Sequence, residues 1–146
     1  MEDNGRRGKN VQVEGVEKAT LARWVQETLT DGSSPADAFW LVVLFAGDRL
    51  VAADRAFVVR DEGRIIGAVT ASMQGETGEG PEIIGLYVLP SYRGQGVGRH
   101  LFRHAYDALK ADGADTIRVV LLSREARRLV ERLKLPDLEV RDVGMA

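Results

Sequence analysis

Residues 92–102 read YRGQGVGRHLF and place three glycines in five positions, directly before an apolar segment. Glycine loses more backbone entropy on folding than any other residue, so such a cluster needs a physical reason. The segment before it, Glu82–Leu89 (EIIGLYVL), is mostly apolar and predicts a central strand that ends at Pro90. A helix is predicted from about Val97 to Asp112. The cluster is therefore the turn of a strand–loop–helix unit.

The glycine cluster is suited to hold an anion at the start of this helix. The first backbone N–H groups of a helix lack intrahelical acceptors and carry the positive end of the helix dipole. Glycines let phosphate or pyrophosphate oxygens approach those N–H groups without a Cβ in the way. Arg93 and Arg99 add positive charge, and the first turn contains no Asp or Glu. The alternative is a glycine-rich turn that only joins a strand to a helix.

Two common phosphate-binding loops do not fit. The Walker pattern needs Lys and then Ser or Thr after its last glycine, whereas Gly98 is followed by Arg99 and His100. The dinucleotide fingerprint needs Gly-x-Gly-x-x-Gly, but this chain reads Gly-x-Gly-x-Gly and has no second βαβ half. The loop belongs to neither class.

The rest of the chain predicts an α/β (α+β) fold with a mixed central sheet flanked by helices. Periodicity does not separate helix from strand over Phe39–Ala46, but the start signals before it favour a helix. We expect one domain over residues 10–146 and a flexible tail over residues 1–9. Besides the unit above, the expected elements are a strand Asn10–Glu14, a helix Val16–Leu29, a helix from Pro35 with Ser34 as its N-cap, strands Arg55–Arg60 and Arg64–Met73 joined by the turn 61–63, a strand Thr116–Leu122, a helix Arg124–Lys134 and a strand Leu138–Val143.

The composition excludes several classes of protein. The 146 residues carry a net charge of −2 with both signs interspersed, so neither nucleic acid nor an anionic membrane is expected as a partner. The absence of cysteine excludes disulfides, thiolate metal sites and a cysteine nucleophile. No segment reads as a signal peptide or a membrane span. We expect a soluble, cytoplasmic protein without a bound metal.

Residues 83–102, IIGLYVLPSYRGQGVGRHLF, resemble the central motif of the GCN5-related N-acetyltransferase (GNAT) superfamily. The signature of that family is Gln/Arg-x-x-Gly-x-Gly/Ala between a strand and a helix, and Arg93, Gly96 and Gly98 match it. The order of predicted elements over residues 10–134 is also similar to the family. The resemblance implies an acetyltransferase that uses acetyl-CoA as co-substrate.

The resemblance also implies roles for individual residues. The backbone of Gly94 through Arg99 would hold the pyrophosphate of acetyl-CoA, and the Val88 N–H would bond the thioester carbonyl, where a fixed donor stabilises developing negative charge. The strands on either side of the motif would splay apart to admit the cofactor, and Gly85 would suit a bulge or a close backbone approach there. The implied cofactor-binding residues are Leu86, Tyr87 and Val88, which would pair with the pantetheine arm, together with Arg93, Gly94, Gln95, Gly96, Val97, Gly98, Arg99 and Ser123.

Acetyl transfer to an amine needs a base for the amine proton and an acid for the leaving thiolate. Without cysteine, we expect direct transfer in a ternary complex rather than an acyl-enzyme. Glu82, at the entry of the central strand, is the candidate base, directly or through water; the alternative is a solvated strand-end carboxylate. Glu76 and Glu79 either attract a cationic acceptor or are merely solvated. The acceptor is a small-molecule or peptide amine that the sequence does not identify.

The chain departs from the family near its C-terminus. Many members carry Asn and, seven residues later, a Tyr that protonates the thiolate; here the positions hold Ser123 and Val130. The general acid is therefore unassigned, and Tyr87 and Tyr92 are not placed at the sulfur by the sequence. Only one strand fits after the last helix, so the sheet edge is either open or completed by a partner chain in a homodimer. A non-catalytic acyl-CoA-binding or regulatory domain is the alternative function.

Overall fold

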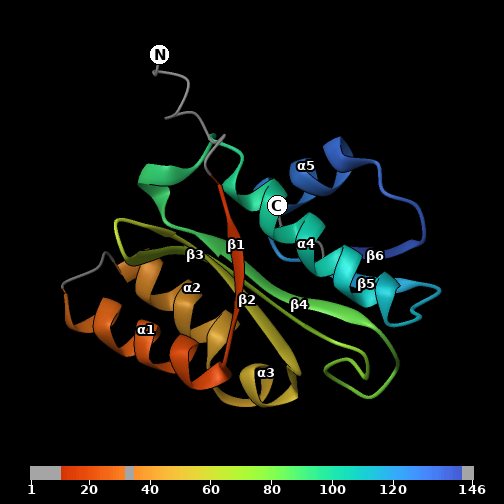
Figure 1. Ribbon diagram of the computed structural model, residues 1–146, viewed down its shortest axis with the longest axis horizontal. Coiled ribbons are helices and arrows are strands. Elements are labelled where there is room, and N and C mark those ends of the chain that lie inside the picture. Colours follow the sequence, from red (N-terminus) through yellow and green to blue (C-terminus); the bar gives the residue numbers. More distant parts are fainter. Residues whose placement is uncertain (1–10, 32–34, 143–146) are drawn as a thin grey trace.

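The computed structural model describes residues 11–31 and 35–142, and its strands form one mixed six-stranded sheet in the order β1-β2-β3-β4-β5-β6 (Figure 1). The first four strands pair antiparallel, and β4, β5 and β6 pair parallel. The predicted fold class is thereby confirmed. The strands are β1 Val13–Val16, β2 Arg55–Asp61, β3 Arg64–Ser72, β4 Glu82–Val88, β5 Ile117–Leu121 and β6 Leu138–Asp142.

The helices begin and end close to the predicted positions. The segment Phe39–Ala46, ambiguous by periodicity, is helical through Phe45. The short helix α3 was not predicted, because its six residues show no apolar repeat. The helices are α1 Lys18–Thr30, α2 Pro35–Phe45, α3 Gly47–Ala52, α4 Val97–Ala111 and α5 Arg124–Leu133, and the 3-10 turn η2 is Pro90–Tyr92.

Three predicted details differ from the structure or lie outside it. The first strand runs from Val13 to Val16 because these residues pair with Val59 through Ala56 of β2, so its predicted start was early. The N-cap assignment of Ser34 and the tail 1–9 lie outside the described residues. Over the described residues, β6 is a single strand at the edge of the sheet, beside β5.

The sheet separates two apolar cores because successive strand residues point to opposite faces. Val69 and Ile83 pack with α4 and α5 on one face, whereas Ala68 and Tyr87 pack with α1 and α2 on the other. In Figure 1 the α1–α2 pair and the α4–α5 pair accordingly lie on opposite sides of the sheet. Within the described residues, no helix is both long and apolar enough to cross a membrane.

Candidate active site

The site begins where β4 and β5 stop pairing. The two parallel strands are joined only at Glu82↔Arg118 and Ile83↔Val119. Beyond that point β4 continues through Val88, and among the described residues β5 pairs only with β6. We call the space between residues 84–88 and residues 120–121 the β4–β5 gap. This geometry agrees with the splayed strands that the sequence predicts.

A bulge in β4 lies at the start of the gap. Thr70 of β3 pairs with Gly85 and Ala71 with Ile83, which leaves Ile84 as the extra residue. A Cβ on Gly85 would lie 3.0 Å from the Leu44 carbonyl oxygen of α2. Gly85 therefore has both features expected of it, a bulge and a close backbone approach. Thr70 is fully buried here, and its Oγ1 has no hydrogen-bond partner in the part of the chain that the structure describes.

The backbone of β4 presents alternate residues to the gap. The Leu89 N–H donates to the Ile66 carbonyl of the β3 side at 2.9 Å. Because the N–H of one residue and the carbonyl of the residue before it point in opposite directions, the Val88 carbonyl points away from β3. The N–H and carbonyl of Val88, and of Leu86 two residues earlier, therefore face the gap. Those of Tyr87 face β3.

The glycine loop follows η2 and starts α4. Gly94 and Gly96 have φ of +80° and +89°, the left-handed region in which glycine pays no Cβ penalty. Gly96 is the N-cap of α4, whose first turn holds no acidic residue. Gln95 and Arg99 are exposed, and Val97 is buried against the sheet. The loop thus brings the unpaired N–H groups of a helix start to the surface beside β4.

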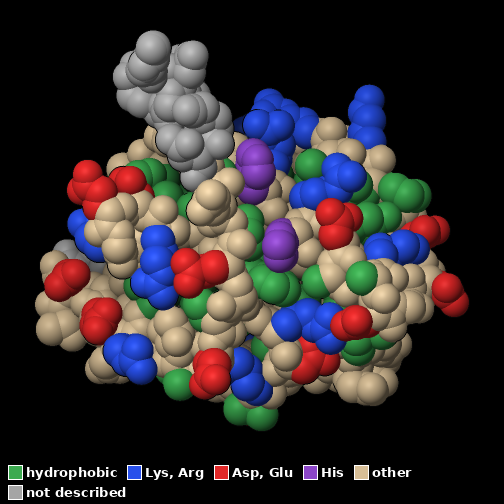
Figure 2. All heavy atoms as spheres, viewed as in Figure 1, with side chains coloured by type: hydrophobic (Ala, Val, Ile, Leu, Met, Phe, Trp, Pro, Cys, Tyr) green, Lys and Arg blue, Asp and Glu red, His purple; other side chains and the backbone are tan. Residues whose placement is uncertain are grey.

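His100 supports this loop, a role that the sequence did not reveal. Its main-chain N–H donates to the Gly96 carbonyl at 3.1 Å, and its ring Nδ1 lies 2.7 Å from the same oxygen. The His104 ring packs edge-on against Phe57, with centroids 4.6 Å apart. Figure 2 shows both histidines on the face of the molecule over α4. The i, i+4 spacing from the N-cap glycine is the signal that could have identified His100.

Glu82 is buried, with 4% of its surface exposed, so its interpretation as a solvated carboxylate is wrong. Its Oε1 accepts the main-chain N–H of Glu76 at 2.7 Å, which closes the loop 73–81 over the carboxyl group. Glu76 and Glu79 themselves are ion-paired, to Arg49 at 3.6 Å and to Arg118 at 2.6 Å. The sequence had predicted neither ion pair.

The two predicted catalytic groups lie at opposite ends of β4. Glu82 is the first residue of β4 and Val88 the last. At about 3.3 Å of strand rise per residue they are roughly 20 Å apart. A base and an oxyanion donor that serve the same carbonyl must be much closer. Glu82 and the Val88 N–H therefore lie at opposite ends of β4, and the Leu86 N–H, nearer to Glu82, faces the same gap.

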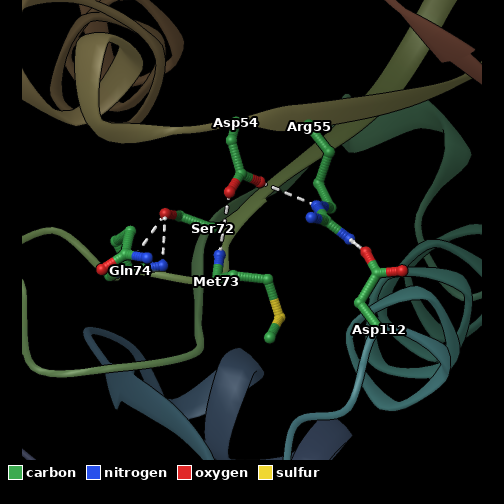
Figure 3. Close-up of polar contacts among 7 residues, drawn as sticks. Asp54, Arg55, Ser72, Met73, Gln74 and Asp112 are labelled. Atoms are coloured by element: carbon green, nitrogen blue, oxygen red, sulfur yellow. Dashed lines mark hydrogen bonds and ion pairs between the residues drawn. The ribbon is translucent and has the colours of Figure 1, made fainter.

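A polar network anchors the start of the loop 73–81 (Figure 3). Asp54 accepts the Met73 N–H at 3.0 Å and Arg55 Nε at 2.7 Å, and Arg55 reaches Asp112 at the end of α4. Ser72 Oγ accepts the N–H groups of the next turn, at Gln74 and Gly75. Burial alone would lower the pKa of Arg55, but the hydrogen bonds to the two aspartates outweigh it and raise that pKa.

The remaining predicted positions lie beside the gap or in the core. Ser123 is the N-cap of α5 and accepts the Ala126 N–H at 3.1 Å. Val130 is buried in the core under α4 and α5. Arg93 donates from Nε to the Val88 carbonyl at 2.9 Å, and its guanidinium lies 5.0 Å from the centre of the Tyr87 ring.

Two hollows lie outside the gap. One of about 410 Å³ is bounded by the loop 113–116 and Arg118, and the other, of about 640 Å³, lies between α1 and the β2–β3 hairpin. Neither includes residues 93–99. Among the described residues, no group of three or more His, Cys, Asp or Glu side chains is placed to hold a metal ion.

The model of the Acetyltransferase (GNAT) family matches residues 19–134, so this chain belongs to that acetyltransferase family. No curated protein matches the sequence. Solved structures are similar in fold over nearly the whole chain.

Three acetyltransferases are examples of these similar structures. The aminoglycoside acetyltransferase meta-AAC0020 from an uncultured soil metagenomic sample, in complex with sisomicin, is 20% identical, with coverage of 93% of this chain and 94% of that chain and a TM-score of 0.55. The aminoglycoside N-acetyltransferase AAC(6')-Iy in complex with CoA is 22% identical, with 97% of each chain covered and a TM-score of 0.58. The ribosomal-protein-alanine N-acetyltransferase from Brucella melitensis biovar Abortus 2308 is 19% identical, with coverage of 86% and 92% and a TM-score of 0.57.

Proposed function

We propose that this protein is an acetyl-CoA-dependent N-acetyltransferase that transfers the acetyl group directly to an amine in a ternary complex. The observation that carries the proposal is the β4–β5 gap beside the left-handed glycines of the loop 93–98. Membership of the acetyltransferase family and the CoA bound by a neighbour of the same fold support it. The absence of cysteine favours direct transfer over an acyl-enzyme.

The residues present fit acetyl-CoA. The main-chain N–H groups of Gly94, Gln95, Gly96, Val97, Gly98 and Arg99 would hold the pyrophosphate, because the first turn of α4 has no acidic residue and the segment has three glycines without Cβ atoms. Leu86 and Val88 would pair with the pantetheine arm through the backbone groups that face the gap. Tyr87 would contribute its side chain only, and the Ser123 hydroxyl is already used as a cap.

When bound, acetyl-CoA supplies an acetyl thioester that an amine can attack. The Leu86 N–H, rather than the Val88 N–H of the sequence prediction, would donate to the thioester oxygen as negative charge develops on it. Glu82 would take the proton of the attacking amine through water, because its carboxyl group is buried beneath the loop that carries Glu76. With Val130 in the core, solvent would protonate the leaving thiolate, which is tolerable because thiol pKa values lie near 8.5.

The acceptor that we propose is a small-molecule or peptide amine, and the protein is expected in the cytoplasm, without nucleic acid as partner. The first test is calorimetric titration of acetyl-CoA and CoA into the purified protein. Thiol release is then measured with a polyamine, an amino acid, an aminoglycoside, a peptide N-terminus and a lysine peptide. Binding with turnover of one amine supports the proposal, binding without turnover favours the acyl-CoA-binding alternative, and no binding contradicts both.

A further inference from the structure

Arg93 is bound to the part of β4 that the proposed pantetheine arm would need. Its Nε–H donates to the Val88 carbonyl at 2.9 Å, and this carbonyl faces the β4–β5 gap. A chain that pairs with β4 as an added strand would donate an N–H to the same oxygen. The Tyr87 ring holds the guanidinium on the same strand, 5.0 Å from its centre. The signature arginine therefore occupies the backbone acceptor at this edge of β4.

The contact is one that an anion can break. Arg93 is exposed and, within residues 11–31 and 35–142, has no carboxylate partner. It makes one hydrogen bond to a neutral carbonyl, whereas a bond between a guanidinium and a phosphate is charge-assisted and roughly twice as strong. The loop that would hold the pyrophosphate begins at the next residue, Gly94. A pyrophosphate bound to this loop would therefore lie next to the residue that carries the guanidinium.

We propose that Arg93 is a strap with two positions, an inference that rests on the proposed function. In the closed position its Nε bonds the Val88 carbonyl. When the glycine loop binds a pyrophosphate, the guanidinium moves to the phosphate oxygens and releases the edge of β4 for the amide-containing arm. The phosphate end of the ligand thereby prepares the site for the arm, and the enzyme discriminates against thioesters without a pyrophosphate.

The test compares a neutral and an anionic ligand. S-acetylpantetheine has the arm and the thioester but no pyrophosphate. In the wild type it must therefore break the hydrogen bond between Arg93 and the Val88 carbonyl, and no phosphate contact of Arg93 replaces that bond. We expect Arg93→Ala to bind S-acetylpantetheine about tenfold more tightly than the wild type, which corresponds to one lost hydrogen bond of about 1.4 kcal/mol. The same variant is expected to bind acetyl-CoA more weakly, because it lacks the phosphate contact.

The control is Arg99→Ala, which removes a positive charge from the first turn of α4, next to the loop, at a residue that has no hydrogen bond to β4 in the described part of the chain. It should weaken acetyl-CoA binding and leave the affinity for S-acetylpantetheine unchanged. If Arg93→Ala weakens both ligands, Arg93 supports the strand and the strap is overturned. If S-acetylpantetheine binds both proteins equally, the strap is overturned as well. Failure of the wild type to bind acetyl-CoA would instead contradict the proposed function, and the strap with it.

A spectroscopic measurement reports on the strap independently of activity. In the ligand-free protein, the ¹⁵Nε–¹Hε resonance of Arg93, assigned by its loss in Arg93→Lys, should be protected from exchange with water. Inorganic pyrophosphate, which has no arm, should shift this resonance and also shift the amide of Leu89, whose peptide unit contains the Val88 carbonyl. An unprotected Arg93 resonance, or a Leu89 amide that pyrophosphate does not shift, contradicts the two-position strap.

Discussion

The Tyr92 hydroxyl donates a hydrogen bond of 2.7 Å to the carboxylate of Asp61, which joins the turn before the glycine loop to the β2–β3 hairpin. These residues are far apart in the sequence, and their bond fixes the direction in which the chain leaves β4. The bond to Asp61 raises the pKa of Tyr92, with smaller contributions from burial and from the negative charge of Asp61.

The raised pKa of Tyr92 predicts a stability change at high pH. The neutral phenol is favoured in the folded state, so its contribution is fully present below the unfolded pKa of about 10 and is lost as pH rises through the folded pKa. Urea unfolding of the wild type and Tyr92→Phe should show the wild type more stable at pH 7 and this advantage reduced near pH 11. An equal difference at both pH values would show that the bond does not titrate.

Gly96→Ala tests the pyrophosphate site. Alanine at φ +89° is strained by about 1 kcal/mol, and its Cβ would stand in the way of the phosphate oxygens. This Cβ would lie 3.1 Å from a terminal nitrogen of the exposed Arg99 side chain, which must move aside. We expect at least roughly tenfold weaker acetyl-CoA binding by calorimetry, equivalent to one lost backbone hydrogen bond. Gly63→Ala, at φ +82° in the β2–β3 turn with open space around it, has matched strain and should keep wild-type affinity. An equal loss of acetyl-CoA affinity in the two variants would show that the glycine loop does not bind the pyrophosphate.

Gly85→Ala tests the close approach between β4 and α2. The added Cβ would lie 3.0 Å from the Leu44 carbonyl oxygen and 3.3 Å from Thr70 Oγ1. Because both neighbours are backbone or buried groups, we expect the free energy of unfolding to fall by about 1–3 kcal/mol. Gly98→Ala lies within α4, and its Cβ would make an ordinary contact of 3.6 Å with the Val88 side chain, so this variant should be neutral or stabilising. Urea denaturation of both variants measures these changes. An unchanged midpoint of unfolding in Gly85→Ala would show that the contact is not tight.

Glu82→Gln tests the proposed base. The amide preserves the shape of the side chain and can still accept the Glu76 N–H, but it cannot take a proton. Once an acceptor amine is identified, we expect kcat to fall by about 10²-fold or more, with little change in the affinity for acetyl-CoA. Glu131→Gln, an exposed position on α5, serves as the control. A Glu82→Gln enzyme with wild-type kcat would show that the base lies elsewhere.

The sequence by itself determined most of the elements and the location of the glycine loop. The turn 61–63 between β2 and β3, the proline after β4 and the glycines before α4 are local signals, and local sterics decide what they form. Ser34 and Pro35 likewise favoured a helix over Phe39–Ala46, where the hydrophobic pattern was ambiguous. The helix α3 was not predicted because it is short and has no apolar repeat.

Only the tertiary structure decided how distant segments meet. Glu82 is buried under the loop 73–81 because it accepts the Glu76 N–H and because the network of Asp54, Arg55 and Asp112 anchors that loop. The hydrophobic pattern of the sequence does not predict these hydrogen bonds. The separation of Glu82 from Val88, and the side of β4 to which each N–H points, follow from strand rise and pairing register. The contact of Arg93 with Val88 has the same origin. Sequence patterns report which conformations each segment favours, whereas these relationships depend on which backbone groups other segments leave unpaired.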